Sequence, residues 1–101
     1  MSTRLQIDSH HYKCKACLKL HVGPTRTLDF HCIREQPSEH GWERIHEAEF
    51  SQTCACDQVV KIIFQVRECP PGNFSYHGYR SADADLLAAP KIREHEDIVD
   101  E

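Results

Sequence analysis

The stretch Val59-Val-Lys-Ile-Ile-Phe-Gln-Val-Arg67 decides the fold class of this 101-residue chain. Its main apolar series occupies alternate positions, namely Val60, Ile62, Phe64 and Val66. Successive side chains of an extended strand point to opposite faces, so these four would share one face. Their β-branched and aromatic character favours a strand over a helix. The stretch therefore predicts a central strand of a mostly β protein.

Two close pairs of cysteines frame the region before this strand. Cys54-Ala-Cys56 ends two residues before it, and Cys17 of Cys14-Lys-Ala-Cys17 lies 37 residues upstream of Cys54. Two such pairs at a distance are typical of a tetrahedral site with four sulfur ligands, because each short spacer lets both thiolates point at one ion. We predict a structural Zn²⁺ held by these four cysteines. The sequence leaves open whether one is replaced by another residue: His11, His21, Cys32 or Cys69.

The other two cysteines are expected to be packing residues. Cys32 alternates with Leu28 and Phe30, which predicts a buried thiol, and Cys69 stands at the end of the central strand. Disulfides are disfavoured because the first residues lack the apolar core of a secretory signal. No stretch reaches the roughly 18–20 apolar residues of a membrane span. We therefore expect a cytoplasmic location and no membrane partner.

The remaining pattern predicts further strands and allows one helix. Alternating runs on both sides of Gly23-Pro-Thr-Arg26 predict a hairpin, with the first cysteine pair at its entrance. Alternation between Trp42 and Phe50 fits a strand, but helix propensity favours a helix there. Residues 74–79 predict a last strand, residues 81–89 a helical turn or two, and residues 1–9 a tail or first strand. We expect one zinc-stabilised domain over residues 1–90 and a solvated acidic tail over residues 91–101.

Charge is unevenly distributed along a chain whose formal net charge is −4. The segment from Ser9 to Leu28 contains no acidic residue and four basic ones: Lys13, Lys15, Lys19 and Arg26. This basic face could contact phosphate or an acidic protein surface, or could simply stabilise the thiolates beside it. Tyr76 and Tyr79 are candidate partner contacts as well, since tyrosine is enriched at protein interfaces.

The cysteine spacing of Cys14-Lys-Ala-Cys17 and Cys54-Ala-Cys56 resembles that of zinc ribbons. The resemblance implies a β fold in which two knuckles clamp one zinc ion, a module used in transcription, translation and many protein complexes. Leu18 and Asp57 stand where that family usually has glycine after each pair, and the second knuckle is one residue short. We predict a zinc-ribbon-like antiparallel sheet of three to five strands with room for one short helix.

Motifs of enzyme chemistry are missing from the sequence. It contains no H-E-x-x-H zinc-hydrolase motif, no G-x-S-x-G nucleophile elbow and no glycine-rich phosphate loop. We therefore predict that the protein is not an enzyme. The expected function is a zinc-stabilised interaction module, an accessory subunit or regulator that binds another protein. The alternative is a nucleic-acid-binding module that uses the basic face around Cys14 and Cys17.

Overall fold

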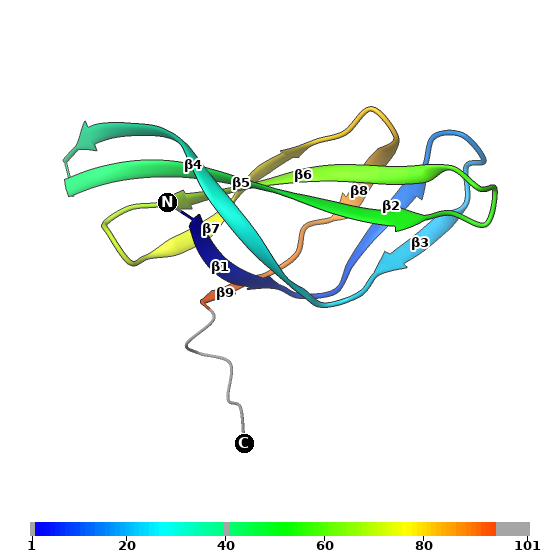
Figure 1. Ribbon diagram of the computed structural model, residues 1–101, viewed down its shortest axis with the longest axis horizontal. Coiled ribbons are helices and arrows are strands. Elements are labelled where there is room, and N and C mark those ends of the chain that lie inside the picture. Colours follow the sequence, from blue (N-terminus) through cyan, green and yellow to red (C-terminus); the bar gives the residue numbers. More distant parts are fainter. Residues whose placement is uncertain (1, 40, 95–101) are drawn as a thin grey trace, which may run out of the picture.

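The computed structural model describes residues 2–39 and 41–94, and this part of the chain is almost entirely β-strand (Figure 1). It forms nine strands: β1 (Ser2–Ile7), β2 (His10–Cys14), β3 (Leu20–Gly23), β4 (Arg26–Ser38), β5 (Gly41–Thr53), β6 (Val59–Glu68), β7 (Phe74–Arg80), β8 (Ala84–Ala88) and β9 (Ile92–Glu94). The predicted mostly β class is confirmed, with more strands than expected. No helix of the described chain has the length and apolar composition needed to cross a membrane.

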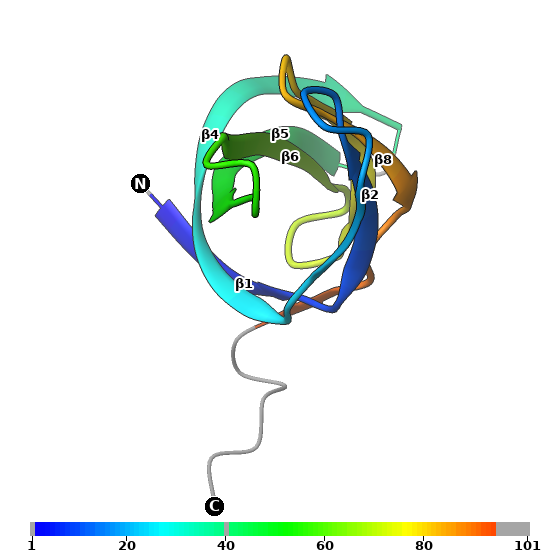
Figure 2. The same ribbon diagram turned by 90° about the vertical axis from the view of Figure 1, so that its right-hand side faces the viewer.

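The strands form two antiparallel sheets that together surround the core. The larger sheet has the order β7-β6-β5-β4-β1-β9, and the smaller one has the order β3-β2-β8. The larger sheet curls until its two edge strands, β7 and β9, lie beside each other. Seen along its long axis, the molecule is a nearly closed ring of strands (Figure 2).

Strand β6 is the central strand that the alternation predicted. Val60, Ile62, Phe64 and Val66 are fully buried, whereas Val59 on the other face is 45% exposed. Phe50 on β5 packs against Phe64 with its ring centroid 6.1 Å away. This aromatic contact lies inside the ring of strands and forms the middle of the core.

The helix favoured between Trp42 and Phe50 is a wrong prediction, because this segment is strand β5. It pairs with β4 on one side and with β6 on the other, from Arg44↔Glu68 to Thr53↔Val59. Two long ladders outweigh the modest helix propensity of its glutamates, arginine and alanine. The turn expected over residues 81–89 is also a strand, β8, which pairs with β2.

The predicted hairpin across Gly23 to Arg26 does not form. Strand β3 pairs with β2 in the small sheet, while β4 pairs with β1 and β5 in the large one. The chain changes sheets at Gly23, where a Cβ atom would lie 2.2 Å from Nε2 of the buried His10. Only glycine lets the backbone pass this close to the imidazole.

The environments of Cys32 and of the C-terminal segment also differ from expectation. Cys32 is exposed, because the ladder between β1 and β4 ends at Ser2↔His31 and leaves the next residues of β4 uncovered on that side. Cys69 is half-buried, as a packing residue would be. Within the predicted tail, residues 92–94 form β9, and Ile92 pairs with Ile7 and packs on the core. Residues 95–101 lie outside the described residues.

Candidate metal centre

Four cysteine sulfurs converge at one end of the molecule. The Sγ atoms of Cys14, Cys17, Cys54 and Cys56 all lie within 4.8 Å of one another. Two of these distances are 3.3 Å, from Cys17 to Cys54, and 4.0 Å, from Cys14 to Cys56. Zinc–sulfur bonds of about 2.3 Å in a tetrahedron place sulfurs about 3.8 Å apart. The arrangement therefore fits a metal ion bound by four thiolates.

The first cysteine pair is held by the turn between β2 and β3. The backbone N–H of Leu18 donates to the Cys14 carbonyl over 2.8 Å, and the Cys14 N–H donates to the Lys19 carbonyl over 3.0 Å. These bonds bend the chain so that the sulfurs of Cys14 and Cys17 face the same point. The knuckle thus lies at the tip of the β2–β3 hairpin.

The second pair occupies the turn between β5 and β6 in the same way. The N–H of Asp57 donates to the Cys54 carbonyl over 2.9 Å, and the Cys54 N–H donates to the Gln58 carbonyl over 2.8 Å. Leu18 and Asp57 both have left-handed backbone angles, with φ of 64° and 68°. These are the two positions at which zinc ribbons usually have glycine, so the backbone keeps the knuckle geometry although the residue type has changed.

His21 is a neighbour of the sulfur cluster rather than one of its members. Its Nε2 lies 3.1 Å from Sγ of Cys54, and its ring stacks on the buried Tyr12 at 5.3 Å. Among the described residues, the cluster of possible metal ligands consists of the four cysteines alone. The other candidate replacements, His11, Cys32 and Cys69, are not part of it.

The sulfurs are too close together to ionise independently. The backbone N–H of Cys56 and the neighbouring thiols lower the pKa of Cys54 to about 6. The N–H of Lys19 acts to lower the pKa of Cys17, but the hydrogen bond with Cys54 and burial raise it to about 12. Like charges this close disfavour each other, whereas a divalent cation between the sulfurs favours the thiolate form of all of them. The donor set is therefore suited to a soft or borderline cation.

The four predicted basic contacts divide into two kinds. Arg26 donates to the Ser51 carbonyl over 2.7 Å and lies over the Phe50 ring, and Lys15 pairs with Asp85 at 3.8 Å. Lys13 and Lys19 have no ion-pair partner among the described residues.

The two predicted aromatic contacts belong mainly to the fold. Tyr76 packs partly buried against the core, and burial raises its phenol pKa. The Tyr79 hydroxyl accepts a hydrogen bond from the Leu86 N–H over 3.1 Å, so it links β7 to β8.

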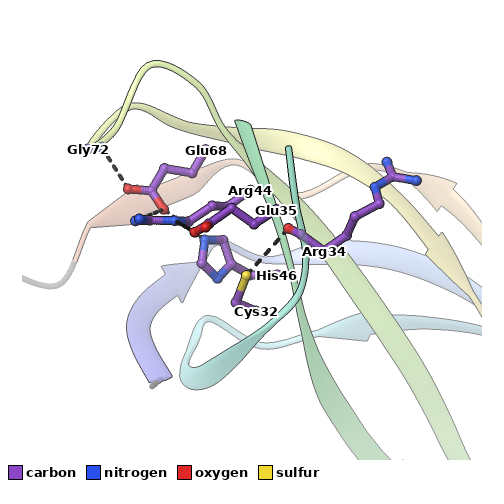
Figure 3. Close-up of polar contacts among 7 residues, drawn as sticks. All are labelled: Cys32, Arg34, Glu35, Arg44, His46, Glu68 and Gly72. Carbon is purple, nitrogen blue, oxygen red and sulfur yellow. Dashed lines mark hydrogen bonds and ion pairs between the residues drawn. The ribbon is translucent and has the colours of Figure 1, made fainter. Parts of the chain in front are cut away.

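Sequence reasoning missed a second polar group, which lies away from the cysteine cluster. There His46, Glu68 and Arg44 meet on the inner face of the large sheet, close to Cys32 (Figure 3). These residues are distant in sequence and form no motif. The register of β5 and β6 could have placed Arg44 opposite Glu68 by counting back from the turn at Cys54.

Comparison with known protein families, with curated proteins and with solved structures finds no match. The similarity to zinc ribbons accordingly consists of the two knuckles and their four sulfurs.

Proposed function

We propose that the protein is a non-enzymatic, zinc-stabilised interaction module that binds another protein through its β3 edge. The metal is proposed to be Zn²⁺, because four thiolates in close array are its usual structural ligand set. Four sulfurs leave no open coordination position for substrate or water, so a structural role fits better than a catalytic one.

Metal binding would contribute a large part of the folding free energy. Structural zinc in small domains is worth about 10–16 kcal/mol at neutral pH. Whole domains are stable by only about 5–15 kcal/mol. The zinc would also fix the β2–β3 hairpin to the β5–β6 hairpin, and so would hold the β3 edge in place.

The observation that carries the interaction proposal is the exposed apolar edge at β3. Leu20 and Val22 on this strand are 70% and 56% exposed, and Leu18 in the knuckle beside them is 64% exposed. Strand β3 is the end strand of its sheet and pairs only with β2 in the described chain. An unpaired edge of this kind can accept a further strand from a partner.

The charge around this edge indicates the chemistry of the partner. Lys13 and Lys19 flank Leu20 in the sheet and in the chain, without ion-pair partners among the described residues. We therefore propose that the partner supplies an extended segment in which apolar side chains alternate with acidic ones. Arg26 is bonded to the Ser51 carbonyl and Lys15 is paired with Asp85. Within the described chain, only two of the four basic residues are therefore free to bind phosphate groups, which favours a protein partner over a nucleic acid.

The metal proposal is tested by elemental analysis of freshly purified, unchelated protein. About one Zn²⁺ per chain is expected, as a single four-thiolate site requires. Protein that is folded by circular dichroism and carries no metal would contradict it.

The interaction proposal is tested by affinity purification with three variants. Leu20→Glu and Val22→Glu place acids on the β3 edge and should abolish the stoichiometric recovery of a specific protein. Leu87→Glu, at an equally exposed site on β8, is the matched control and should retain it. Equal recovery by all variants would refute the β3 edge. Fluorescence anisotropy with a 20-mer oligonucleotide tests the alternative, because affinity that falls steeply with salt would favour nucleic acid.

A further inference from the structure

A small cavity opens on the inner face of the large sheet, away from the cysteine cluster. Its volume is about 350 Å³, and it is lined by Thr3, Cys32, Glu35, Arg44, His46 and Glu68. Five of these lining residues stand in two rows of cross-strand neighbours: Glu35, Arg44 and Glu68 in one, Cys32 and His46 in the other. Residues directly opposite each other in antiparallel strands point to the same face, so both rows meet inside the curl of the sheet. Figure 3 shows these side chains.

His46 is the buried centre of this group. The residue is only 4% exposed, and its Nε2 lies 2.8 Å from Oε1 of Glu68. The carboxylate can only accept, so Nε2 carries a proton, and in the neutral tautomer that this requires Nδ1 is an acceptor. Nδ1 is buried and has no hydrogen-bond partner among the described residues. A buried, unpaired basic nitrogen at a cavity is an unusual feature that calls for a donor.

Glu68 is held as a carboxylate by several groups. Burial acts to raise its pKa, but hydrogen bonds from the Gly72 N–H, over 2.8 Å, and from His46 outweigh burial and hold the pKa below its usual range. Arg44 adds a positive charge 3.8 Å away. The charge on Glu68 fixes the orientation of the imidazole through the hydrogen bond at Nε2.

Cys32 supplies a nucleophile next to the imidazole. It is the direct cross-strand partner of His46, which places the two Cβ atoms about 4.5–5.5 Å apart. In Figure 3 the His46 ring lies between the Glu68 carboxylate and the Cys32 side chain. The thiol donates to the Arg34 carbonyl at 3.4 Å and is otherwise open to solvent.

We propose that Cys32 is a redox-modifiable thiol whose oxidation by small hydroperoxides is promoted by His46 as general base, with Glu68 as the positioning residue. The cavity is at the small end of the range for ligand pockets, about 300–1,000 Å³, which suits a small polar oxidant. The modification is stoichiometric, so it adds no turnover to the proposed interaction module.

The reaction balances with the hydroperoxide as the only reagent. The Cys32 sulfur attacks the distal oxygen of the hydroperoxide, an S–O bond forms and the O–O bond breaks. The thiol proton passes to Nδ1 of His46 and from there to the departing alkoxide or hydroxide. Sulfur loses two electrons and becomes a sulfenic acid, while the peroxide is reduced to an alcohol or water. The new S–O–H group can donate a hydrogen bond to the buried Nδ1.

The test uses the full-length, zinc-loaded protein and hydrogen peroxide. Sulfenic acid is trapped with dimedone, and mass spectrometry follows each cysteine separately. Cys32 should react first, at least about tenfold faster than the half-buried Cys69, as the help of a positioned base implies. His46→Gln should slow Cys32 by about tenfold or more. His31→Gln is the matched control and should leave the oxidation rate of Cys32 unchanged. His31 is next to Cys32 in the chain, but it lines a different pocket, of which Cys32 is not a part.

Two further measurements separate a general base from a structural role. In His46→Gly, added imidazole should restore the oxidation rate of Cys32, which a residue needed only for packing would not allow. In Glu68→Gln, the ¹⁵N shifts of His46 should report loss of the Nε2–H tautomer together with slower oxidation. Melting temperature and zinc content verify that each variant is folded.

A comparison of the wild-type protein with a peptide tests the proposal without any substitution. Cys32 in the wild-type protein should react at least about tenfold faster than the same cysteine in a synthetic peptide of residues 28–36. The proposal is overturned if Cys32 reacts no faster than the peptide, or if a folded His46→Gln variant reacts within about threefold of wild type.

Discussion

Replacing Gly23 with alanine should destabilise the protein strongly, because β3 passes directly over a buried imidazole. The added Cβ would lie 2.2 Å from Nε2 and 2.3 Å from Cε1 of His10, about 1 Å inside an ordinary contact. His10 is 1% exposed, and the rings of Phe50 and Phe64 hold it with centroids 4.8 and 5.0 Å away. The imidazole therefore cannot move aside without displacing the aromatic core.

The expected cost of Gly23→Ala is about 3 kcal/mol, the upper end of the range for overpacked cores. For a domain of this size, that lowers the melting temperature by about 12–24 °C. Thermal unfolding by circular dichroism at a fixed free zinc concentration measures it, since metal binding would otherwise shift the apparent stability. Gly78→Ala is the matched control: its Cβ would meet only Oε1 of Gln65, at 3.7 Å, and should change stability by less than about 0.5 kcal/mol.

A double-mutant cycle identifies the cause of the Gly23→Ala effect. His10→Ala removes the ring that the new methyl group would strike, so Gly23→Ala should cost about 1 kcal/mol or less in that background. The coupling energy would then be about 2 kcal/mol, which is typical of residues in direct contact. If the stability losses of the two substitutions add within about 0.5 kcal/mol, or if Gly23→Ala alone is as stable as wild type, the proposed clash is refuted.

Three further predictions concern the metal, the acid response and the C-terminal strand. Cys14→Ser should unfold or aggregate the chain through loss of the metal site, whereas Cys32→Ser, at an exposed position, should shift the melting temperature by only a few degrees. Equal melting temperatures of the two variants would contradict the ligand assignment. Hydrogen bonds from Arg80 lower the pKa of Glu47, so its stabilisation is full above the unfolded pKa and is lost as pH falls through the lower, folded pKa. The stability difference between wild type and Glu47→Gln should therefore be largest near pH 7 and should shrink as the pH falls into the acid range, and a pH-independent difference would contradict this. A chain ending at residue 90 should melt several degrees below one ending at residue 94, because only the latter keeps the Ile92 contact with the core; equal melting temperatures would show that β9 contributes nothing.

Local alternation was sufficient to predict β6, and pairing between distant strands was what the sequence could not supply. Val60 to Val66 alternate cleanly because one face of β6 is fully buried. On β5, the adjacent residues Ile45 and His46 are both buried, so buried and exposed residues do not alternate there, and the sequence pattern is also compatible with a helix. The two runs around Gly23 are adjacent in the chain, yet each pairs with a different strand, so no local pattern could reveal the change of sheet.

The cysteine cluster and the Cys32 cavity differ in how far sequence reasoning could reach. The four cysteine positions follow from spacing alone, because a knuckle is a local turn that presents two ligands. His46 and Glu68 are 22 residues apart in sequence, so their contact depends on the register of the hairpin formed by β5 and β6. Only the turn at Cys54 to Gln58 sets that register, and a slip of one residue would turn either side chain to the opposite face.

Both sites depend on β5, and its length determines how independently they act. Cys54 follows directly after this strand, and His46 lies eight residues earlier, which at about 3.3 Å per residue places them roughly 26 Å apart. The Debye length at physiological ionic strength is about 8 Å, so a charge change at one site is screened from the other. Between them lie the buried rings of Phe50 and Phe64, which pack tightly and present no titratable group. Oxidation of Cys32 should therefore leave zinc affinity unchanged, and any coupling between the two ends would have to arise from a change in the packing of this shared core.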